Sequence, residues 1–210
     1  MVGKEAIIMT KIKICGLSRI QDIEAVNSAL PDYIGFVFAK SRRQVDNDTA
    51  AMLKRALDTR IKAVGVFVNE EITKIQELCR SGIIDMVQLH GDEDNGYIKS
   101  LRGAVNVPII KGVRGGSDFN TTHANSFDCD YLLFDTYMGN EYGGTGKSFD
   151  WSLLKNFKKP FFLAGGIDIK NIKTAIKTAN PYCVDVSSGV ETDGVKDETK
   201  IKEIVGFMTA

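Results

Sequence analysis

The chain has no excess of charge of either sign. Its 210 residues carry 27 basic and 27 acidic side chains, so the formal net charge is zero. Proteins that bind nucleic acids or anionic membranes usually carry a marked positive charge. The sequence therefore predicts neither a nucleic-acid partner nor a membrane partner, although a small local basic pocket remains compatible with it.

Long apolar runs are also missing. No segment approaches the roughly 18 apolar residues that a membrane-spanning helix needs. Residues 1–10 contain one short apolar patch and lack the hydrophobic stretch and cleavage site of a secretion signal. We therefore expect a cytoplasmic protein in which residues 1–10 form an N-terminal extension with no assigned role.

Cysteine is scarce, and no two cysteines are close in sequence. The four cysteines are Cys15, Cys79, Cys129 and Cys183. Their wide spacing disfavours a zinc site or a disulfide framework and is typical of a reducing compartment. A scattered cysteine is usually a small buried apolar residue, so a chemical role for Cys15 must be argued from its position.

Short β-branched runs alternate with amphipathic segments along the whole chain, with no linker or low-complexity tract between them. Parallel strands need crossover connections, so this alternation predicts a parallel sheet. Eight units in about 200 residues indicate a single-domain α/β protein of the (β/α)8 TIM-barrel type over residues 11–210, rather than an open sheet of five or six strands. The expected strands cover residues 11–15, 33–38, 63–68, 86–90, 107–111, 131–135, 161–164 and 184–187. The expected helices cover residues 20–30, 49–58, 71–81, 169–178 and 196–207.

Alternation within the strands places several polar residues inside this barrel. Successive side chains of a strand point to opposite faces. In the first strand Ile12 and Ile14 share one face, which leaves Lys13 and Cys15 on the other. The same pattern turns further polar residues inward near the carboxyl ends of their strands, where barrels of this type carry their active sites. These residues are Gln88, His90, Asp135, Asp185 and Ser187.

Three glycine-rich segments follow the sixth, seventh and eighth predicted strands. They cover residues 143–147, 164–167 and 187–191. Glycine lets backbone N–H groups approach an anion, and barrels often bind phosphate with the loops after strands seven and eight. The segments therefore predict a phosphate site, although a tight turn would explain any one of them. The candidate residues are Gly144, Gly146, Gly165, Gly166, Ser187, Ser188 and Gly189.

Cys15 and Asp135 end two strands of the expected ring and would face a common substrate. A thiolate and a carboxylic acid placed in this way can move protons. Asp135 could instead cap a helix or loop, and Asp185 is more typical of a buried carboxylate that orients its neighbours. We expect Gln88 and His90 to line the mouth.

Arg42 and Arg43 follow the second strand. Such a run of cations usually lies in solvent, but an arginine at a barrel mouth suits bidentate capture of a carboxylate.

Together these residues resemble the phosphoribosylanthranilate isomerases of tryptophan biosynthesis. The resemblance extends from about Lys11 to Phe207. The segments that carry it, taken together and in this order, are highly specific. They are KICGL at 13–17, GFVF at 35–38, VGVFVN at 64–69, VQLHG at 87–91, FDT at 134–136, GGTGKSFDW at 143–151, AGGI at 164–167 and VDVSSGVE at 184–191.

The resemblance implies an Amadori rearrangement of N-(5-phosphoribosyl)anthranilate to 1-(o-carboxyphenylamino)-1-deoxyribulose 5-phosphate, with no cofactor and no metal. It implies that Asp135 is the general acid on the furanose oxygen and Cys15 the general base at sugar C2. Arg43 aligns with the arginine that binds the anthranilate carboxylate. Arg42 occupies a place where the family often has proline, so it could share that contact.

Two pKa shifts follow from these roles: we expect a lowered pKa for the Cys15 thiol and a raised pKa for Asp135. The only partner that we expect is a small phosphorylated substrate, bound by a monomer or a homodimer. Two alternatives stay open, another phosphosugar-metabolising barrel enzyme and a non-catalytic phosphate-ligand binding protein. A pure binder would need neither Cys15 nor Asp135.

Overall fold

The structure is a computed structural model that describes residues 10–114, 121–135, 150–154 and 157–209. Apart from Thr10, the predicted N-terminal extension lies outside these residues. Within the described part of the chain, none of the helices combines the length and the apolar character that crossing a bilayer requires.

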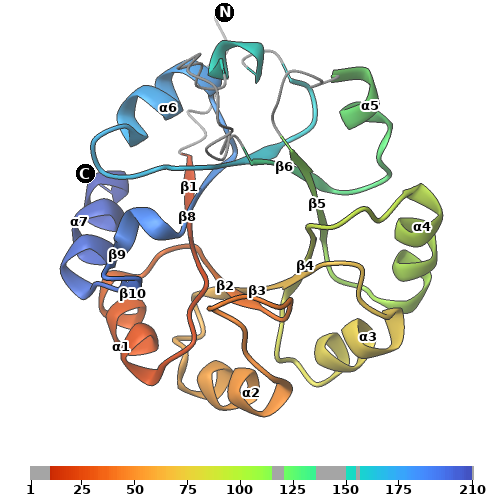
Figure 1. Cartoon of the computed structure of the whole chain (residues 1–210), viewed down its shortest axis with the longest axis horizontal. Helices are drawn as coiled ribbons and strands as arrows, with labels where there is room; N and C mark the ends of the chain where they lie inside the picture. The colour runs from red at the N-terminus through yellow and green to blue at the C-terminus, as the bar shows by residue number, and fades with distance from the viewer. Residues whose placement is uncertain (1–9, 115–120, 136–149, 155–156, 210) are drawn as a thin grey trace, which may run out of the picture.

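Eight parallel strands form a closed ring (Figure 1). Each strand pairs with the next along the chain, and the ring closes where the last strand pairs with the first through Ile12 and Val184. This topology confirms the predicted (β/α)8 barrel. The strands are β1 (Lys11–Cys15), β2 (Tyr33–Val37), β3 (Lys62–Phe67), β4 (Met86–Leu89), β5 (Ile109–Arg114), β6 (Tyr131–Asp135), β7 (Phe161–Ala164) and β8 (Cys183–Val186).

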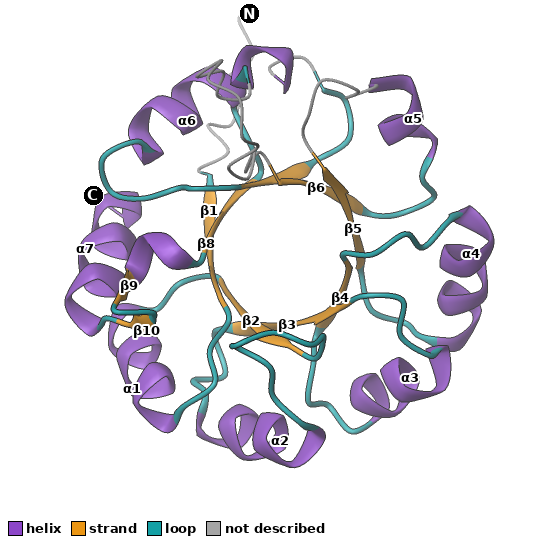
Figure 2. Ribbon diagram, viewed as in Figure 1, coloured by secondary structure: helices purple, strands orange, loops and turns teal. Residues whose placement is uncertain are grey.

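Helices surround the ring on its outside (Figure 2). Five lie within three residues of their predicted ends. They are α1 (Ile20–Ala29), α2 (Asn47–Ala56), α3 (Ile72–Arg80), α6 (Ile172–Ala179) and α7 (Glu198–Thr209). The sequence did not predict α4 (Asn95–Ala104) or α5 (Thr121–Ser126). Gly96 and Gly103 weaken the helical pattern of α4, yet Asp94 caps its first turn by accepting a hydrogen bond from the Tyr97 N–H.

The strands separate two apolar layers, as their alternation predicts. Ile12 and Ile14 belong to the layer between strands and helices, whereas Lys13 points into the ring and is fully buried. The inner layer is smaller. It consists of Tyr33, Val64, Met86, Ile110, Leu133, Phe162, Ala164 and Cys183.

Aromatic side chains fill the amino-terminal end of the ring. The hydroxyls of Tyr33 and Tyr182 lie 2.8 Å apart, and the Lys11 ammonium lies 5.4 Å from the centre of each ring. Tyr131 packs against Tyr182 and edge-on against Phe162. The polar interior residues are therefore left at the carboxyl end, where the strands open into a cavity.

A short hairpin follows β8. A 3-10 helix, η2 (Ser188–Val190), leads into β9 (Glu191–Thr192), which pairs with β10 (Val195–Lys196). The two turn residues, Asp193 and Gly194, have φ values of 51° and 79°, as a type I′ turn requires. The register sets Lys196 directly opposite Glu191, so the hairpin delivers one cation and one anion next to the mouth of the ring.

Candidate active site

A cavity of about 490 Å³ opens at the carboxyl end of the ring. Barrels of this type carry their active sites at that end. Most of the predicted site residues line the cavity, which brings together side chains from β1, β4, β6 and β8 and from the loops that follow the strands. The predicted residues in its wall are Cys15, Arg43, Gln88, His90, Asp135, Gly165, Gly166, Asp185, Ser187 and Ser188.

Lys13 lies beneath this cavity and joins several of its polar groups. Its Nζ donates to Asp185 Oδ2 at 2.9 Å and to Gln88 Oε1 at 3.0 Å. Burial disfavours the charged form, but Asp185 and then Cys15 outweigh burial and raise the pKa of Lys13 above its ordinary value. A permanent ammonium group therefore sits in the floor of the site.

Cys15 lies beside that ammonium group, on the same face of β1. A Cβ atom at Gly35 would lie 2.7 Å from Cys15 Sγ and 3.2 Å from Lys13 Nζ, so both groups pack over the bare glycine of β2. Burial raises the pKa of the Cys15 thiol, against the lowering effect of Lys13 and with a further raising effect from Asp185. The predicted lowering of the Cys15 pKa is therefore wrong. Burial raises this pKa by more than the positive charge of Lys13 lowers it.

Asp135 ends β6 on another side of the cavity. Its Oδ2 lies 3.6 Å from His90 Nε2, and both side chains are about one-third exposed at 34% and 30%. The other ring nitrogen of His90 lies 3.3 Å from Gln88 Nε2. A continuous line of polar contacts therefore runs from Asp135 through His90 and Gln88 to Lys13, which adjoins Cys15.

The two carboxylate oxygens of Asp185 differ in their contacts. Its Oδ2 binds Lys13, whereas its buried Oδ1 has no hydrogen-bond partner among the described residues. Buried carboxylate oxygens are normally satisfied. Asp185 also lines the cavity, so this unsatisfied oxygen belongs to a residue of the cavity wall.

Arg43 reaches the cavity from the loop after β2 and is held by Glu191. Its Nε and Nη2 lie 2.7 and 3.0 Å from the two carboxylate oxygens of Glu191. Arg42 also binds Glu191, through Nη2 at 2.6 Å, but its side chain is 56% exposed and it is not among the cavity-lining residues. Lys196 completes the cluster with Nζ 2.9 Å from Glu191 Oε1. Arg43, rather than Arg42, therefore lines the cavity.

Glu191 is the centre of this cluster. Burial opposes its ionisation, but hydrogen bonds from Arg43 and Lys196 outweigh burial and lower its pKa to about 2. Its side chain is only 5% exposed, so the carboxylate is shielded from solvent by the cations that bind it. Gly16, with φ of +86°, leaves the space that the Arg43 stem occupies, since a Cβ there would overlap that side chain.

The structure describes two of the three glycine-rich segments, those after β7 and β8. Gly165 and Gly166 have φ values of 98° and 66° and line the cavity, and the space beside Gly166 is open. Ser187 donates from Oγ to the Cys15 carbonyl at 3.1 Å. Gly189 is not among the lining residues, and any side chain there would overlap the Ile167 carbonyl. The predicted phosphate-binding residues Gly144 and Gly146 lie outside the described residues.

Sequence reasoning missed three residues of this site, Lys13, Glu191 and Lys196. Strand alternation already turned Lys13 inward, which was a sufficient signal to name it. Glu191 and Lys196 were harder to find because their strands have two residues each. The Asp193-Gly194 pair was the available signal, since this dipeptide favours a type I′ hairpin.

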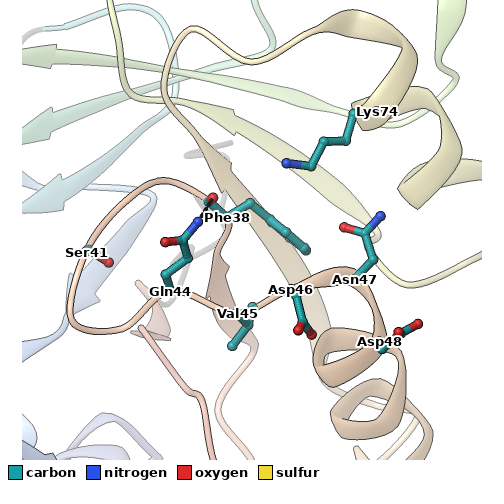
Figure 3. Close-up of a pocket in the computed structure, with 8 residues that line it drawn as sticks. All are labelled: Phe38, Ser41, Gln44, Val45, Asp46, Asn47, Asp48 and Lys74. Atoms are coloured by element: carbon teal, nitrogen blue, oxygen red, sulfur yellow. Dashed lines mark hydrogen bonds between the residues drawn. The ribbon is translucent and has the colours of Figure 1, made fainter.

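A second hollow is lined by the loop between β2 and α2, by the start of α2 and by Lys74 of α3 (Figure 3). Its volume is about 810 Å³, larger than that of the cavity in the ring. Its polar groups largely serve the fold: the Gln44 amide donates to the Phe38 carbonyl, and Asp46 caps α2. Lys74, at its far wall, binds Glu70. Among the described residues that line it, the hollow has no thiol and carboxyl pair like Cys15 and Asp135.

The fold and the cavity define the class of protein. A closed (β/α)8 ring with a thiol, a carboxyl group and glycine-rich loops at its carboxyl end has the architecture of barrel enzymes that act on small phosphorylated substrates. The family model described as N-(5'phosphoribosyl)anthranilate (PRA) isomerase matches residues 12–206. The chain belongs to this family.

Individual relatives agree with the family. N-(5'-phosphoribosyl)anthranilate isomerase from Endomicrobium trichonymphae is 53% identical over 200 residues, covering 95% of this chain and 98% of the relative. The crystal structure of phosphoribosyl anthranilate isomerase from Thermotoga maritima matches with a TM-score of 0.82 at 33% identity, covering 96% of this chain and 99% of that one.

A further crystal structure of such an isomerase, in complex with reduced 1-(o-carboxyphenylamino)-1-deoxyribulose 5-phosphate, matches with a TM-score of 0.80 at 30% identity. That match covers 96% of this chain and 99% of the other. The chain is thus an isomerase of tryptophan biosynthesis that catalyses the Amadori rearrangement of N-(5-phosphoribosyl)anthranilate.

Proposed function

We propose that Asp135 is the general acid and Cys15 the general base of this isomerisation. The observation that carries the proposal is that both side chains, from β6 and β1, line one cavity at the carboxyl end of the ring. A proton donor and a proton acceptor in a shared cavity can act on different atoms of one substrate.

The first step opens the sugar ring. Asp135 donates its proton to the furanose oxygen while the bond between that oxygen and C1 breaks. The lone pair of the anthranilate nitrogen forms a double bond to C1, so the product is a protonated Schiff base and the carboxylate of Asp135. For Asp135 to carry a proton at neutral pH its pKa must be raised, which stays a prediction.

The second step moves the C2 proton. The Cys15 thiolate takes this proton, and the C–H electron pair forms a C1–C2 double bond as the C1–N double bond becomes single. The resulting enolamine gains a proton at C1 and loses its enol proton to give the ketone. Since burial favours the thiol form of Cys15 in the ligand-free site, the step needs a nearby positive charge to hold the thiolate.

The three polar ends of the substrate each have a candidate partner. Arg43 is held by Glu191 in a position suited to the anthranilate carboxylate. Gly165, Gly166 and Ser188 offer a backbone cradle to the phosphate after β7 and β8. Asp185, which lines the cavity and has an unsatisfied carboxylate oxygen, is the acceptor that we assign to a sugar hydroxyl.

The remaining predicted residues have supporting places. Gln88 is buried between Lys13 and His90 and lines the cavity floor, and His90 contacts Asp135. The proposed contacts of the cavity with carboxylate, phosphate and hydroxyl groups support a phosphorylated sugar derivative as the binding partner. A cytoplasmic location and a monomeric or homodimeric state stay predictions.

A direct assay tests the activity of this chain. The purified protein is mixed with freshly generated phosphoribosylanthranilate, and the loss of substrate fluorescence is followed against a protein-free control. We expect a large acceleration with no added metal or cofactor. An unchanged rate, with substrate-analogue binding intact, would instead favour a non-catalytic binding protein on the same scaffold.

A further inference from the structure

The acid–base mechanism leaves one charged group in the cavity floor without a role. Lys13 is fully buried, and no step assigned to Asp135 or Cys15 moves a proton to or from it. Burying an ammonium group is costly unless it is paired and hydrogen-bonded. A stability role alone would be served by an apolar residue in the inner layer, so the position of Lys13 calls for a functional explanation.

Lys13 and Cys15 are fixed against each other by the backbone. They are two residues apart on β1, so their side chains emerge on the same face. Both pack over Gly35, where a Cβ would lie 2.7 Å from the sulfur and 3.2 Å from the ammonium nitrogen. A side chain at position 35 would displace both groups, so glycine leaves the room in which they pack side by side.

The other contacts of Lys13 fix its direction. An ammonium group has three donors. One binds Asp185 at 2.9 Å and one binds Gln88 at 3.0 Å, and Cys15 also acts on the charge of this ammonium group. Gln88 is held in turn by His90. The ammonium group is therefore anchored from β8 and β4 while it faces the sulfur on β1.

We propose that Lys13 is a positioning residue that acts through Cys15, its fixed charge holding the sulfur as a thiolate while the sugar C2 proton is removed. The proposal rests on the assignment of Cys15 as the base. Lys13 does not itself accept the proton, because its own pKa is raised and it stays charged at every working pH. It supplies the positive charge that a buried thiolate requires.

The sign of the effect depends on all charged groups around the sulfur. Lys13 from β1 and Lys196 from β10 favour the thiolate, whereas Asp185 from β8 opposes it. Arg43 and His90 reach the same cavity from the loops after β2 and β4. Lys196 is the weaker of the two lysine effects, and it is also bound to Glu191. Removal of Lys13 and removal of Asp185 should therefore shift the Cys15 pKa in opposite directions.

The test measures the thiol directly and without substrate. The substrate-free protein is alkylated with iodoacetamide over a range of pH, and the rate at Cys15 is read by peptide mass spectrometry. In Lys13→Met, which keeps a long unbranched side chain and removes its charge, we expect the apparent pKa of Cys15 to rise by about one to three units. Cys79 on α3, whose pKa burial raises to about 11, is the internal reference and should not shift.

Asp185→Asn provides a second test of the proposal in case Lys13→Met does not fold. In Asp185→Asn the ammonium group remains and the opposing charge is lost, so the apparent pKa of Cys15 should fall. A Cys15 pKa that stays unchanged in a folded Lys13→Met protein, or that does not fall in Asp185→Asn, would overturn the proposal.

Turnover supplies a second readout. The acidic limb of the pH profile of kcat/KM, where activity rises as Cys15 loses its proton, should move to higher pH with the alkylation pKa in Lys13→Met, which a purely structural role would not produce. Failure of the base assignment would look different: Cys15→Ala would keep its activity while the alkylation shifts in the lysine and aspartate variants remained.

Discussion

Arg43, which lines the cavity, is bound to Glu191 through two contacts of 2.7 and 3.0 Å. A bidentate arginine–carboxylate pair fixes the plane of the guanidinium group as well as its position. Glu191 is itself fixed by Lys196, directly across the β9–β10 hairpin. The hairpin thus orients an arginine that follows a different strand, and this arrangement has consequences for binding and for stability.

Replacing Arg43 by alanine should weaken substrate binding more than it slows the chemical steps. We expect KM to rise by about ten- to a hundredfold with a smaller change in kcat, because the carboxylate contact is made before and after the proton transfers. Arg42→Ala is the matched control, since Arg42 also binds the Glu191 carboxylate but does not line the cavity. Steady-state kinetics of both variants check this; equal effects on KM would assign the contact to neither arginine alone.

Glu191→Gln should change how stability depends on pH. The folded pKa of Glu191 is about 2, below the value of about 4.3 for an unfolded chain. A carboxylate with a depressed pKa stabilises the fold above its unfolded pKa, and this contribution is lost as the pH falls through the folded pKa. The variant should therefore be less stable than the native chain at neutral pH, and the difference should shrink between about pH 5 and pH 2.

Urea unfolding at a series of pH values measures this convergence. Glu198→Gln is the control, because Glu198 is an exposed carboxylate on α7 with a side chain 60% exposed. A stability difference for Glu191→Gln that is the same at pH 7 and pH 2.5 would contradict the assignment of a depressed pKa to this residue.

Cys15→Ala should cost about two to four orders of magnitude in kcat, the usual contribution of a positioned general base. Affinity for a phosphorylated product analogue should be largely retained, since the proposed phosphate and carboxylate contacts do not involve the thiol. Cys183→Ala is a control for loss of a buried thiol, because Cys183 belongs to the inner apolar layer. Comparable losses of turnover in the two variants would point to a packing effect.

Asp135→Asn should abolish the acid step while preserving the shape of the side chain. We expect kcat to fall by about two to four orders of magnitude. If Asp135 is the acid, the basic limb of the native pH profile, where activity falls as the needed proton is lost, should report its titration, and that limb should disappear from the residual activity of the variant. A variant with nearly full rate would show that the acid lies elsewhere in the cavity.

Lys111→Met should destabilise the fold through a buried ion pair on the outer side of the ring. Lys111 lies 2.8 Å from Glu93, and their side chains are 3% and 1% exposed. Removing one partner leaves an uncompensated buried charge, which costs about 3–5 kcal/mol of unfolding free energy. The control is Lys54→Met, whose pair with Asp85 is partly exposed and should contribute at most about 1 kcal/mol. Urea denaturation distinguishes the two, and equal costs would contradict the argument from burial.

The sequence determined the ring and the direction of its interior side chains. Strand alternation is a local property of the backbone with a period of two, so Lys13 and Cys15 must share a face wherever β1 lies. The regular strand–helix spacing likewise predicts eight parallel strands, and the structure has them. Helix α4 escaped prediction because two glycines mask its pattern and its cap at Asp94 is visible only in the folded chain.

Tertiary structure alone decided which groups meet and how hydrated they are. The contacts of Lys13 with Asp185 and Gln88 join positions 172 and 75 residues away, and no local pattern encodes such pairs. The pKa of Cys15 follows from the same convergence, because burial and the surrounding charges exist only once the ring has closed. The sequence could name Cys15 as a residue of the mouth, but only the packing around it decides that its thiolate needs the charge of Lys13.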